Sequence, residues 1–401
     1  MEGNVPEIRL KGFTNPYEEC KLGDIVHKLR SYPLSRDVET SEITGYRYIH
    51  YGDIHKQVAD IVTSDELLPK IRSGDYISVE QGDLVLADAS EDYTGIAEPC
   101  VILHKPKETV VAGLHTIALR PIETDPLYLY YLLHTDRFKK FCSYVGTGLK
   151  VFGITFSNLS KYEVKLPKKN EQTAIGKFIY TLDTTITLHK RKLDGLKELK
   201  KGYLQQMFPQ TGETVPRVRF DGFTEPWGQQ KLGDIATITM GQSPDSANYT
   251  ENPQDHILVQ GNADMKNGWV TPRVWTTQVT KSAQKGCLIM SVRAPVGDVG
   301  KTEHDVVLGR GVCGINGNEF LFQSLGKMKE DGFWTKISTG TTFESINSND
   351  IREAILTIPC DKEQTAIGNF LHNLDKQITA QAEKLEQLKQ LKVAYLQKMF
   401  V

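Results

Sequence analysis

Two short stretches of this sequence carry residue types that could perform chemistry or hold a nucleotide. Pro244-Asp245, followed by Asp264-Met265-Lys266, has the carboxylates and the lysine with which a metal-dependent nuclease holds its ion. GRGVCG at Gly309–Gly314 has the glycine spacing of a dinucleotide-binding turn, but we do not expect the following INGNEF to start the helix that such a turn requires. Matches this short arise readily by chance, so neither stretch predicts catalysis.

The remaining candidates for catalysis are weaker. NPY at Asn15–Tyr17 is one proline short of the loop with which adenine methyltransferases hold a flipped base, and the second copy of the surrounding block has EPW there. No GxxxxGK(S/T) phosphate loop occurs, and isolated histidines such as His115 and His304 are typical of surfaces and cores. We therefore predict no catalytic residue and no metal ligand, and a turn with a packed aromatic side chain at Tyr17.

Polar residues suited to recognition gather in two corresponding parts of the chain. Arginine, asparagine, glutamine and serine side chains on turns can hydrogen-bond base edges and phosphates. LRSYPLSRD and GYRYIHYGDIHK supply such residues in the first half, and GQSPDSANYT and ILVQGNADMKNGW supply them in the second. Taken singly these are ordinary polar loops, and only their clustering at equivalent places suggests recognition. The candidate DNA-binding residues are Ser31, Arg36, Tyr48, His55, Gln242, Ser243, Asn248 and Asn262.

The elements that carry these loops occur twice. EQTAIG opens a segment at Glu171 and again at Glu363, and the two segments share about 22 identities over 38 positions. VPEIRLKGFTNPYEECKLGDI at Val5–Ile25 returns at Val215–Ile235 as VPRVRFDGFTEPWGQQKLGDI, with about 12 identities. Each half therefore runs as block, variable region and helix, which predicts two domains of one fold carrying different surfaces. Within the first variable region, DPLYLYYLLHTDRFKKF at Asp125–Phe141 is predicted to be one helix.

Apolar residues at heptad spacing predict that the two repeated segments are long helices. Each spans about 36 residues, or roughly 54 Å at 1.5 Å per residue. An isolated helix of this pattern would leave its apolar stripe in water, so each copy needs a partner, and the other copy is the obvious one. The predicted coiled-coil seam consists of Ile175, Ile179, Leu182, Ile186, His189, Leu193, Leu196 and Tyr203 in the first helix and of Ile367, Leu371, Leu374, Ile378, Gln381, Leu385, Leu388 and Tyr395 in the second.

His189 and Gln381 interrupt this seam at the same place in each helix. If the helices run antiparallel, the two residues meet near the centre, where a buried polar pair would fix the register. The alternative is that each side chain reaches out to solvent.

Composition limits the class of protein. With 401 residues, 39% of them hydrophobic and 24% charged, the chain is long enough for two or three domains with their own cores. It has no run of about 18 apolar residues, and MEGNVPEIRL lacks the features of a signal region, so we expect a cytoplasmic protein. Six singly scattered cysteines predict free thiols, and neither a disulfide framework nor a zinc site.

The net charge of -2 is awkward for a protein that binds nucleic acid. Neutralising phosphates normally leaves a basic footprint on the sequence. Either the chain does not bind nucleic acid, or its basic surface is local, or partner chains supply part of the charge.

The repeated segments carry a resemblance to a known family. LPKKNEQTAIG…TLDTTI…KLDGLKELKKGYLQQMF and IPCDKEQTAIG…NLDKQI…KLEQLKQLKVAYLQKMF closely resemble the specificity (S) subunit of type I restriction–modification systems. GFTEPWGQQKLGDI before the second variable region and GQSPDSANY within it are similar to the same family, so the resemblance covers essentially the whole chain.

The resemblance implies an α+β fold: two similar α/β target recognition domains separated by two long helices, which form an antiparallel coiled coil with a pseudo-twofold internal repeat. The predicted segments are target recognition domain 1 at residues 1–169, spacer helix 1 at 170–208, a linker at 209–214, target recognition domain 2 at 215–360 and spacer helix 2 at 361–401.

The family implies a non-catalytic subunit whose two domains each read one half of a bipartite, asymmetric DNA site in the major groove. Implied partners are double-stranded DNA, two methyltransferase (M) subunits and motor/nuclease (R) subunits, and no membrane. S-adenosylmethionine, ATP and Mg²⁺ are expected in the partner subunits, and no cofactor in this chain. A helical spacer of about 54 Å suits two readers roughly one duplex turn or slightly more apart, around 34 to 36 Å from centre to centre.

Two other classes of function stay open from the sequence. A stand-alone nuclease or DNA methyltransferase would show metal-dependent or S-adenosylmethionine-dependent activity as a purified chain. A duplicated coiled-coil protein-interaction scaffold would fail to bind DNA in every combination with its partners.

Overall fold

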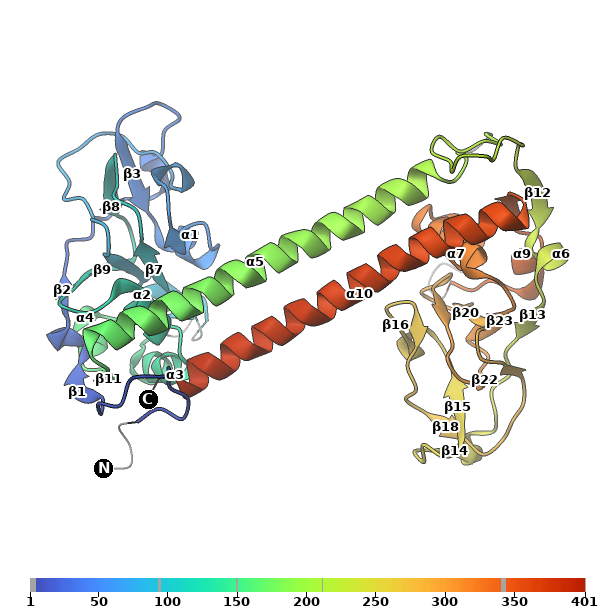
Figure 1. Cartoon of the computed structure of the whole chain (residues 1–401). Coiled ribbons are helices and arrows are strands. Elements are labelled where there is room, and N and C mark those ends of the chain that lie inside the picture. The colour runs from blue at the N-terminus through green and yellow to red at the C-terminus, as the bar shows by residue number, and fades with distance from the viewer. Residues whose placement is uncertain (1–4, 93–94, 149–150, 211, 340–343, 401) are drawn as a thin grey trace. The chain divides into compact units, whose positions relative to one another are not determined.

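The computed structural model describes residues 5–92, 95–148, 151–210, 212–339 and 344–400, and the chain divides into two compact units (Figure 1). Unit 1 comprises Met1–His189 and Lys384–Val401, and unit 2 comprises Lys190–Glu383. The two long helices are α5 (Lys169–Gln206) and α10 (Asp361–Lys398). Each unit therefore contains one variable region together with parts of both long helices.

Unit 1 is built round a five-stranded sheet in the order β2-β9-β5-β7-β4, next to a parallel pair formed by β3 and β8. The strands of these two sheets are β2 (Val26–Lys28), β3 (Tyr46–Ile49), β4 (Ile61–Val62), β5 (Leu84–Ala87), β7 (Pro99–Ile102), β8 (Thr109–Ala112) and β9 (Thr116–Pro121). Around them lie β1 (Glu18–Lys21) paired with β11 (Glu163–Leu166), β6 (Ala89–Ser90) paired with β10 (Phe152–Gly153), and the helices α1 (Tyr51–His55), α2 (Pro126–Leu132), α3 (Asp136–Val145) and α4 (Phe156–Leu159).

Unit 2 repeats this plan with shorter strands, in sheets ordered β13-β23-β20-β21-β17-β16 and β14-β18-β15-β22-β19. The strands are β13 (Ile238–Met240), β14 (Tyr249–Thr250), β15 (His256–Val259), β16 (Met265–Lys266), β17 (Trp269–Val270), β18 (Trp275–Thr276), β19 (Ser282–Ala283), β20 (Leu288–Ser291), β21 (Val299–Lys301), β22 (Val306–Leu308) and β23 (Val312–Ile315). Beside them lie β12 (Gly228–Lys231) paired with β24 (Ile355–Ile358), and the helices α6 (Leu232–Ile235), α7 (Glu319–Glu330), α8 (Phe333–Ile337) and α9 (Ser348–Arg352).

The central strand of each unit is apolar on both faces because each face covers a different core. In β5, Leu84 and Leu86 pack into the core that includes the long helices, whereas Val85 and Ala87 pack into a second core with β3 and β8. β20 divides in the same way, with Leu288 on one side and Ile289 on the other. A sheet buried on both faces explains why these strands appear in the sequence as continuous apolar runs.

Within each unit the long helices run antiparallel (Figure 1). In unit 1, Phe178 packs on Tyr395 with ring centroids 4.9 Å apart, and Asp183 Oδ1 lies 2.6 Å from Lys392 Nζ. Residue numbers thus rise along α5 while they fall along α10. In unit 2 the matching contacts are Lys200 Nζ to Asp375 Oδ1 at 2.7 Å and Tyr203 on Phe370 at 4.7 Å.

The predicted seam residues are all buried or half-buried. Those with less than a tenth of their surface exposed are Ile175, Ile179, Leu193, Ile367, Leu371, Leu374, Gln381, Leu385 and Leu388. Those that are half-buried are Leu182, Ile186, His189, Leu196, Tyr203, Ile378 and Tyr395. The pairing of His189 with Gln381 stays a prediction.

The core of each unit is completed by the far end of the helix that begins in the other unit. Phe400, which follows α10, stacks on Tyr128 of unit 1 with ring centroids 5.0 Å apart. Phe208, which follows α5, stacks on Phe320 of unit 2 at 5.3 Å. The sequence YLQ(Q/K)MF therefore recurs because it fills the same place in two cores.

The glutamate of each EQTAIG segment forms a buried ion pair with the repeated block. Arg219 donates from Nε and Nη2 to the two carboxylate oxygens of Glu363, at 2.7 and 2.8 Å. Arg9 and Glu171 form the same bidentate pair at 2.8 and 2.7 Å. Both glutamates are 1% exposed, so removing an arginine would leave a buried charge without its counter-ion.

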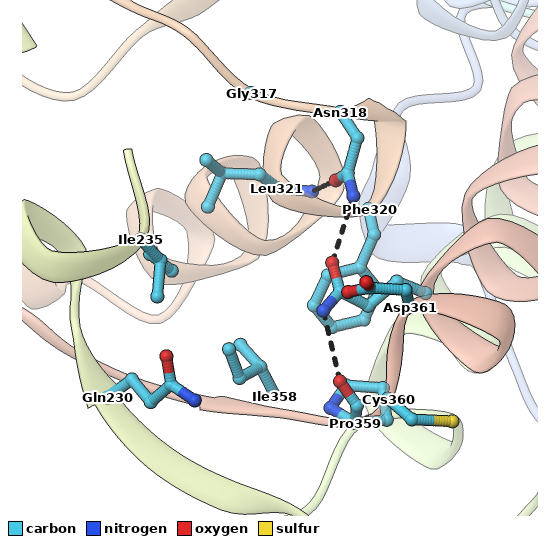
Figure 2. Close-up of a pocket in the computed structure, with 11 residues that line it drawn as sticks. Gln230, Ile235, Gly317, Asn318, Phe320, Leu321, Ile358, Pro359, Cys360 and Asp361 are labelled. Carbon is cyan, nitrogen blue, oxygen red and sulfur yellow. Dashed lines mark hydrogen bonds between the residues drawn. The ribbon is translucent and has the colours of Figure 1, made fainter. Parts of the chain in front are cut away.

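The glutamine and the glycine of the same segment fix the neighbouring helix. Gln364 donates to Pro359 O at 3.0 Å and accepts from Asn318, the N-cap of α7, beside a cavity of about 540 Å³ (Figure 2). A Cβ at Gly368 would lie 2.9 Å from Phe320 N, so only glycine allows this approach. Gln172 bonds to Pro167 and to Asp125, the N-cap of α2, in the corresponding way.

All six cysteines lie in the described part of the chain as free thiols, as the sequence predicted. No helix in the described ranges combines the length and the apolar character needed to cross a bilayer.

Substituting Arg219→Ala is expected to destabilise unit 2 by about 3 kcal/mol, because Glu363 would remain buried and unpaired. All four tryptophans lie in residues 227–334, so urea unfolding followed by tryptophan fluorescence reports on unit 2 alone. Arg217→Ala is the matched control: its contact with Glu213 is 3.8 Å long and largely exposed, so we expect less than about 1 kcal/mol. Equal effects of the two substitutions would contradict a structural role for the buried pair.

Candidate nucleic-acid interface

The carboxylates that resembled a nuclease motif hold the backbone in place. Asp264 is 2% exposed; its Oδ2 accepts from Gln260 N at 2.7 Å and its Oδ1 lies 2.8 Å from Arg273 Nη2. Asp245 Oδ1 accepts from Ala247 N at 3.0 Å and so caps the 3-10 turn Ser246–Asn248. Within the described ranges no group of three or more His, Cys, Asp or Glu side chains is placed to hold a metal ion.

The other two motifs are also structural. GRGVCG forms a turn and then strand β23, so its glycines do not lie at a helix N-terminus. The expectation that INGNEF would not start a helix was wrong, because α7 begins at Glu319 with Asn318 as its N-cap. Tyr17 of NPY and Trp227 of EPW are each 2% exposed, which agrees with a packed aromatic at this position.

A buried aspartate fixes the turn after the first strand of each parallel pair. In unit 1 this turn follows β3, and Asp53 Oδ2 accepts from His50 N at 3.2 Å. In unit 2 it follows β15, and Asp264 accepts from the equivalent backbone at Gln260. Because the surrounding sequences YGDIH and GNADM differ, the two units share a turn geometry while presenting different side chains.

An arginine from another segment neutralises each of these aspartates. Arg36 Nη2 lies 2.8 Å from Asp53 Oδ1, and Arg273 Nη2 lies 2.8 Å from Asp264 Oδ1. Both aspartates are less than 5% exposed, whereas about half of each arginine side chain reaches solvent. These two arginines therefore fix the turns, and their charge is largely cancelled.

A second turn in unit 2, which we call the glycine turn (Gly309–Gly311), packs against the first. Gly309 N donates to Val259 O at 2.8 Å, and a Cβ at Gly311 would lie 2.1 Å from Gln260 O. A Cβ at Gly241 would lie 2.0 Å from Gly309 O. Three glycines thus allow three backbone segments to meet where any side chain would separate them.

The corresponding turn in unit 1 keeps the same backbone bonds. Gly113 N donates to Ile49 O at 2.9 Å, and Asp88 N donates to His115 O at 3.0 Å. His115 is half exposed, with its Nδ1 3.2 Å from Asp88 Oδ1 and its ring 5.3 Å from that of Tyr51. The two units therefore bring the same loops together and fill them with different residues.

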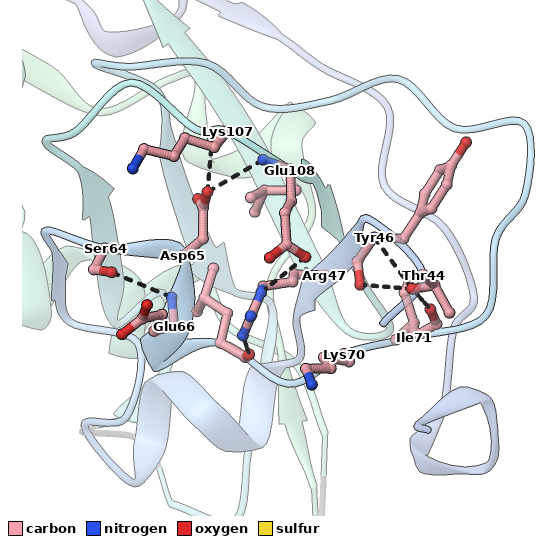
Figure 3. A network of polar contacts seen from close by, with 12 residues as sticks. Thr44, Tyr46, Arg47, Ser64, Asp65, Glu66, Lys70, Ile71, Lys107 and Glu108 are labelled. Carbon is pink, nitrogen blue, oxygen red and sulfur yellow. Dashed lines mark hydrogen bonds and ion pairs between the residues drawn. The ribbon is translucent and has the colours of Figure 1, made fainter. Parts of the chain in front are cut away.

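A buried polar network in unit 1 holds the loop between β7 and β8 (Figure 3). Asp65 accepts from His104 Nε2 at 2.6 Å and from Lys107 N at 2.7 Å. Arg47 donates to Leu68 O at 2.6 Å, and its Nε forms an ion pair with Glu108 at 3.0 Å without hydrogen-bond geometry. Apart from Arg47 Nε, the buried polar groups of this network are hydrogen-bonded, so the network positions a loop.

The family described as "Type I restriction modification DNA specificity domain" matches residues 15–198 and 224–390, which is most of the chain. The chain belongs to this family.

Relatives of known type agree with this membership. A protein of Methanocaldococcus jannaschii named as the MjaX specificity subunit of a type I restriction enzyme is 27% identical over 408 residues, covering 98% of this chain and 94% of the relative. The crystal structure of the type I restriction-modification system S subunit from M. genitalium matches with a TM-score of 0.65 at 14% identity, covering 99% of each chain. A chain from a structural study of complex assembly and conformational transition in a type I R-M system matches with a TM-score of 0.56 at 21% identity, covering 96% of this chain and 98% of that one. At these identities the structural matches show the fold.

The DNA-binding residues predicted in the first recognition domain lie in different environments. Arg36 and His55 line one cavity of about 690 Å³, where His55 Nε2 lies 2.8 Å from Ala89 O. Tyr48 is fully buried and donates to Glu39 Oε1 at 2.7 Å, so it could touch DNA only if its neighbours moved. Ser31 Oγ is buried and has no hydrogen-bond partner in the described structure. Their contacts with DNA stay predictions.

Three of the residues predicted in the second recognition domain lie on or beside the two packed turns. Gln242 is exposed, and Ser243 Oγ accepts from Arg310 N at 3.1 Å, which places both beside the glycine turn. Asn262 begins the 3-10 turn Asn262–Asp264 that follows Gln260. Asn248 donates to Gln278 at 3.0 Å, so its amide already has a partner. Their roles on DNA also stay predictions.

Sequence reasoning missed the arginines at this surface. Arg293 and Arg310 are both exposed, and Val292 N donates to Gly311 O at 2.9 Å, which brings their two segments together. Arg310 could have been predicted from its position between two glycines in GRGVCG, but the glycine spacing was compared only with that of a dinucleotide-binding turn.

The network around Asp65 predicts a pH dependence in the first recognition domain. Burial alone would raise the pKa of Asp65, but hydrogen bonds from His104 and from the backbone N–H groups of Lys107 and Glu108 outweigh burial and hold its pKa below 3.8. A carboxylate with a lowered folded pKa stabilises the fold above its unfolded pKa and loses that contribution as the pH falls through the folded value.

We therefore expect Asp65→Asn to cost about 2 kcal/mol of local stability at pH 6 and progressively less below pH 3.8. Hydrogen exchange of the Lys107 and Glu108 amides, corrected for the intrinsic effect of pH, measures the difference from wild type. Glu66→Gln changes an exposed neighbour and should leave exchange unaltered at each pH. A gap between Asp65→Asn and wild type that widened on acidification would refute the assignment.

Proposed function

We propose that this chain is the non-catalytic sequence-recognition subunit of a type I restriction–modification complex, and that each unit reads one half of a bipartite, asymmetric DNA site. The observation that carries the proposal is the common backbone of the two recognition domains combined with their unlike loops. Equivalent turns are held by Asp53 and Asp264, yet the side chains that surround them differ. Two similar readers with different surfaces call for two different half-sites.

The long helices are proposed to set the distance between the half-sites. α5 and α10 each contain 38 residues, and each contributes to the cores of both units. Because helix length is fixed at about 1.5 Å per residue, a change in residue number changes length in a predictable way. Loops of a recognition domain can then change a half-site without altering the gap.

The proposed partners are double-stranded DNA, two methyltransferase subunits and motor/nuclease subunits, with S-adenosylmethionine, ATP and Mg²⁺ bound by those subunits in the cytoplasm. Exposed apolar side chains on the long helices support protein docking there. Leu188 is 58% exposed and Val393 is 53% exposed in unit 1, and Leu199 is 46% exposed in unit 2. Apolar side chains that stay exposed on these helices suit surfaces that a partner covers.

Methylation mapping tests the proposed function directly. We expect adenine methylation at one bipartite sequence in cells that express this chain with its methyltransferase subunit, and none at that sequence when the gene for this chain is deleted. Sequencing of modified adenines across the genome makes the measurement. Methylation that persisted at the same sites without this chain would rule out its role in recognition.

Removing one heptad from each helix tests the spacer. Deletion of Ile186–Lys192 together with Ala382–Leu388 shortens each helix by seven residues while keeping the heptad phase. The gap in the methylated site is expected to shrink by roughly 3 base pairs, at about 1.5 Å per residue and 3.4 Å per base pair, with both half-sites unchanged. Deleting only Ile186–Lys192 is the control, because it mismatches the helices and should abolish methylation. An unaltered gap in the double deletion would exclude the spacer role.

A further inference from the structure

We propose that Arg310 reads a guanine in the half-site bound by unit 2, and that it sets the base preference at that position. The inference rests on the proposed recognition function and adds to it a specific residue and a specific base. Three properties of the residue carry it: a fixed backbone, an unoccupied guanidinium and a setting of neutral hydrogen-bonding groups.

The backbone that carries Arg310 is held on both sides. The flanking glycines lie in direct contact with neighbouring main chain, as the close approaches at Gly241 and Gly311 show. Arg310 N donates to Ser243 Oγ at 3.1 Å, and Gly309 N donates to Val259 O at 2.8 Å. A side chain that starts from a fixed point loses less freedom when it binds, which favours a specific contact.

The guanidinium of Arg310 is free to bind a ligand. Its side chain is exposed, and no carboxylate of the described residues lies within ion-pair distance of it. By contrast, Arg219 and Arg273 of the same unit are engaged with Glu363 and Asp264. The free fork of N–H donors matches the O6 and N7 acceptors of guanine in the major groove.

The surroundings favour a base edge over a phosphate. Gln242, Ser243 and Gln260 lie on the backbone segments that meet at the glycine turn, and their amide and hydroxyl groups suit base edges. Arg293 begins from the segment that bonds to Gly311 and offers a second exposed cation for the backbone of the duplex. An arginine on a fixed backbone among neutral polar groups, with another cation on the neighbouring segment, is the arrangement expected of direct readout.

The first recognition domain lacks this feature at the equivalent position. Leu114 occupies the place of Arg310 in the turn that begins at Gly113, and its side chain has no hydrogen-bonding group. The proposed guanine contact is therefore confined to one half-site, which agrees with an asymmetric target.

The test uses the complete complex with its methyltransferase subunits and a library in which the half-site of unit 2 is randomised. Arg310→Ala is expected to lower the preference for guanine at one position by roughly 10- to 100-fold, because each bidentate arginine–guanine contact discriminates by about that factor. Arg310→Lys is expected to lose most of the same preference for guanine. The lysine ammonium keeps the positive charge but lacks the two parallel N–H donors of the guanidinium. The half-site read by unit 1 should be unchanged in both variants.

Lys336→Ala is the matched control, because it removes one exposed charge from α8 of the same unit and should leave every base preference intact. Tryptophan fluorescence is to be measured on all three variants to check that they fold. Base preferences unchanged in both Arg310 variants would overturn the inference while leaving the proposed function standing. Uniform weakening across all sequences, restored by lysine, would also overturn it, since that result identifies a phosphate contact. A wild-type complex with no bipartite preference would overturn both proposals.

Discussion

The exchange of helix ends between the two cores is the constraint on which the rest of this structure depends. Phe208 and Phe400 each lie at the end of a long helix that begins in one unit and closes the core of the other. Burying a phenylalanine typically stabilises a core by several kcal/mol, so neither unit is complete without the other repeat. The length and the register of both helices are consequently fixed by packing at their ends as well as by the seam between them.

This constraint explains which residues the duplication retains and which it has released. Residues retained in both halves connect the long helices to the domains. Arg9 and Arg219 form ion pairs with the glutamates of the EQTAIG segments, and the glutamines of those segments bond to the N-caps of α2 and α7. The glycines of the same segments allow the close approach of the neighbouring helices. Apart from the N-caps of α2 and α7, the loops of the variable regions have no part in the contacts just described and are free to differ. The turn after the first strand of each parallel pair does need a fixed shape. In both units a buried aspartate paired with an arginine holds that turn, although the surrounding sequences differ.

The elements that depend on local pattern were predictable, and those that depend on tertiary contacts were not. Heptad spacing and the repeat predicted the two long helices, and the resemblance of the repeated segments to a known family implied their antiparallel pairing. Asp125–Phe141 was predicted as one helix but forms two, because Thr135 accepts a hydrogen bond from Phe138 N and begins a second helix there. The burial of Tyr48 and the ion pair of Arg36 depend on segments distant in sequence, so composition alone could not separate these side chains from available ones.

The net charge of -2 leaves open how the individual cations of the chain are used. Many arginines and lysines stabilise the frame through ion pairs, as Arg9, Arg219 and Lys392 do, and their charge is cancelled within the protein. Arg310, which is exposed and has no such partner among the described residues, lies on the glycine turn, and exposed Arg293 lies on the neighbouring segment that bonds to Gly311. A strong uniform field would bind every DNA sequence equally, because phosphates carry no sequence information. A nearly neutral chain that places a few free donors at fixed positions gains discrimination between sequences at the expense of general affinity, which partner subunits bound to the same duplex can supply.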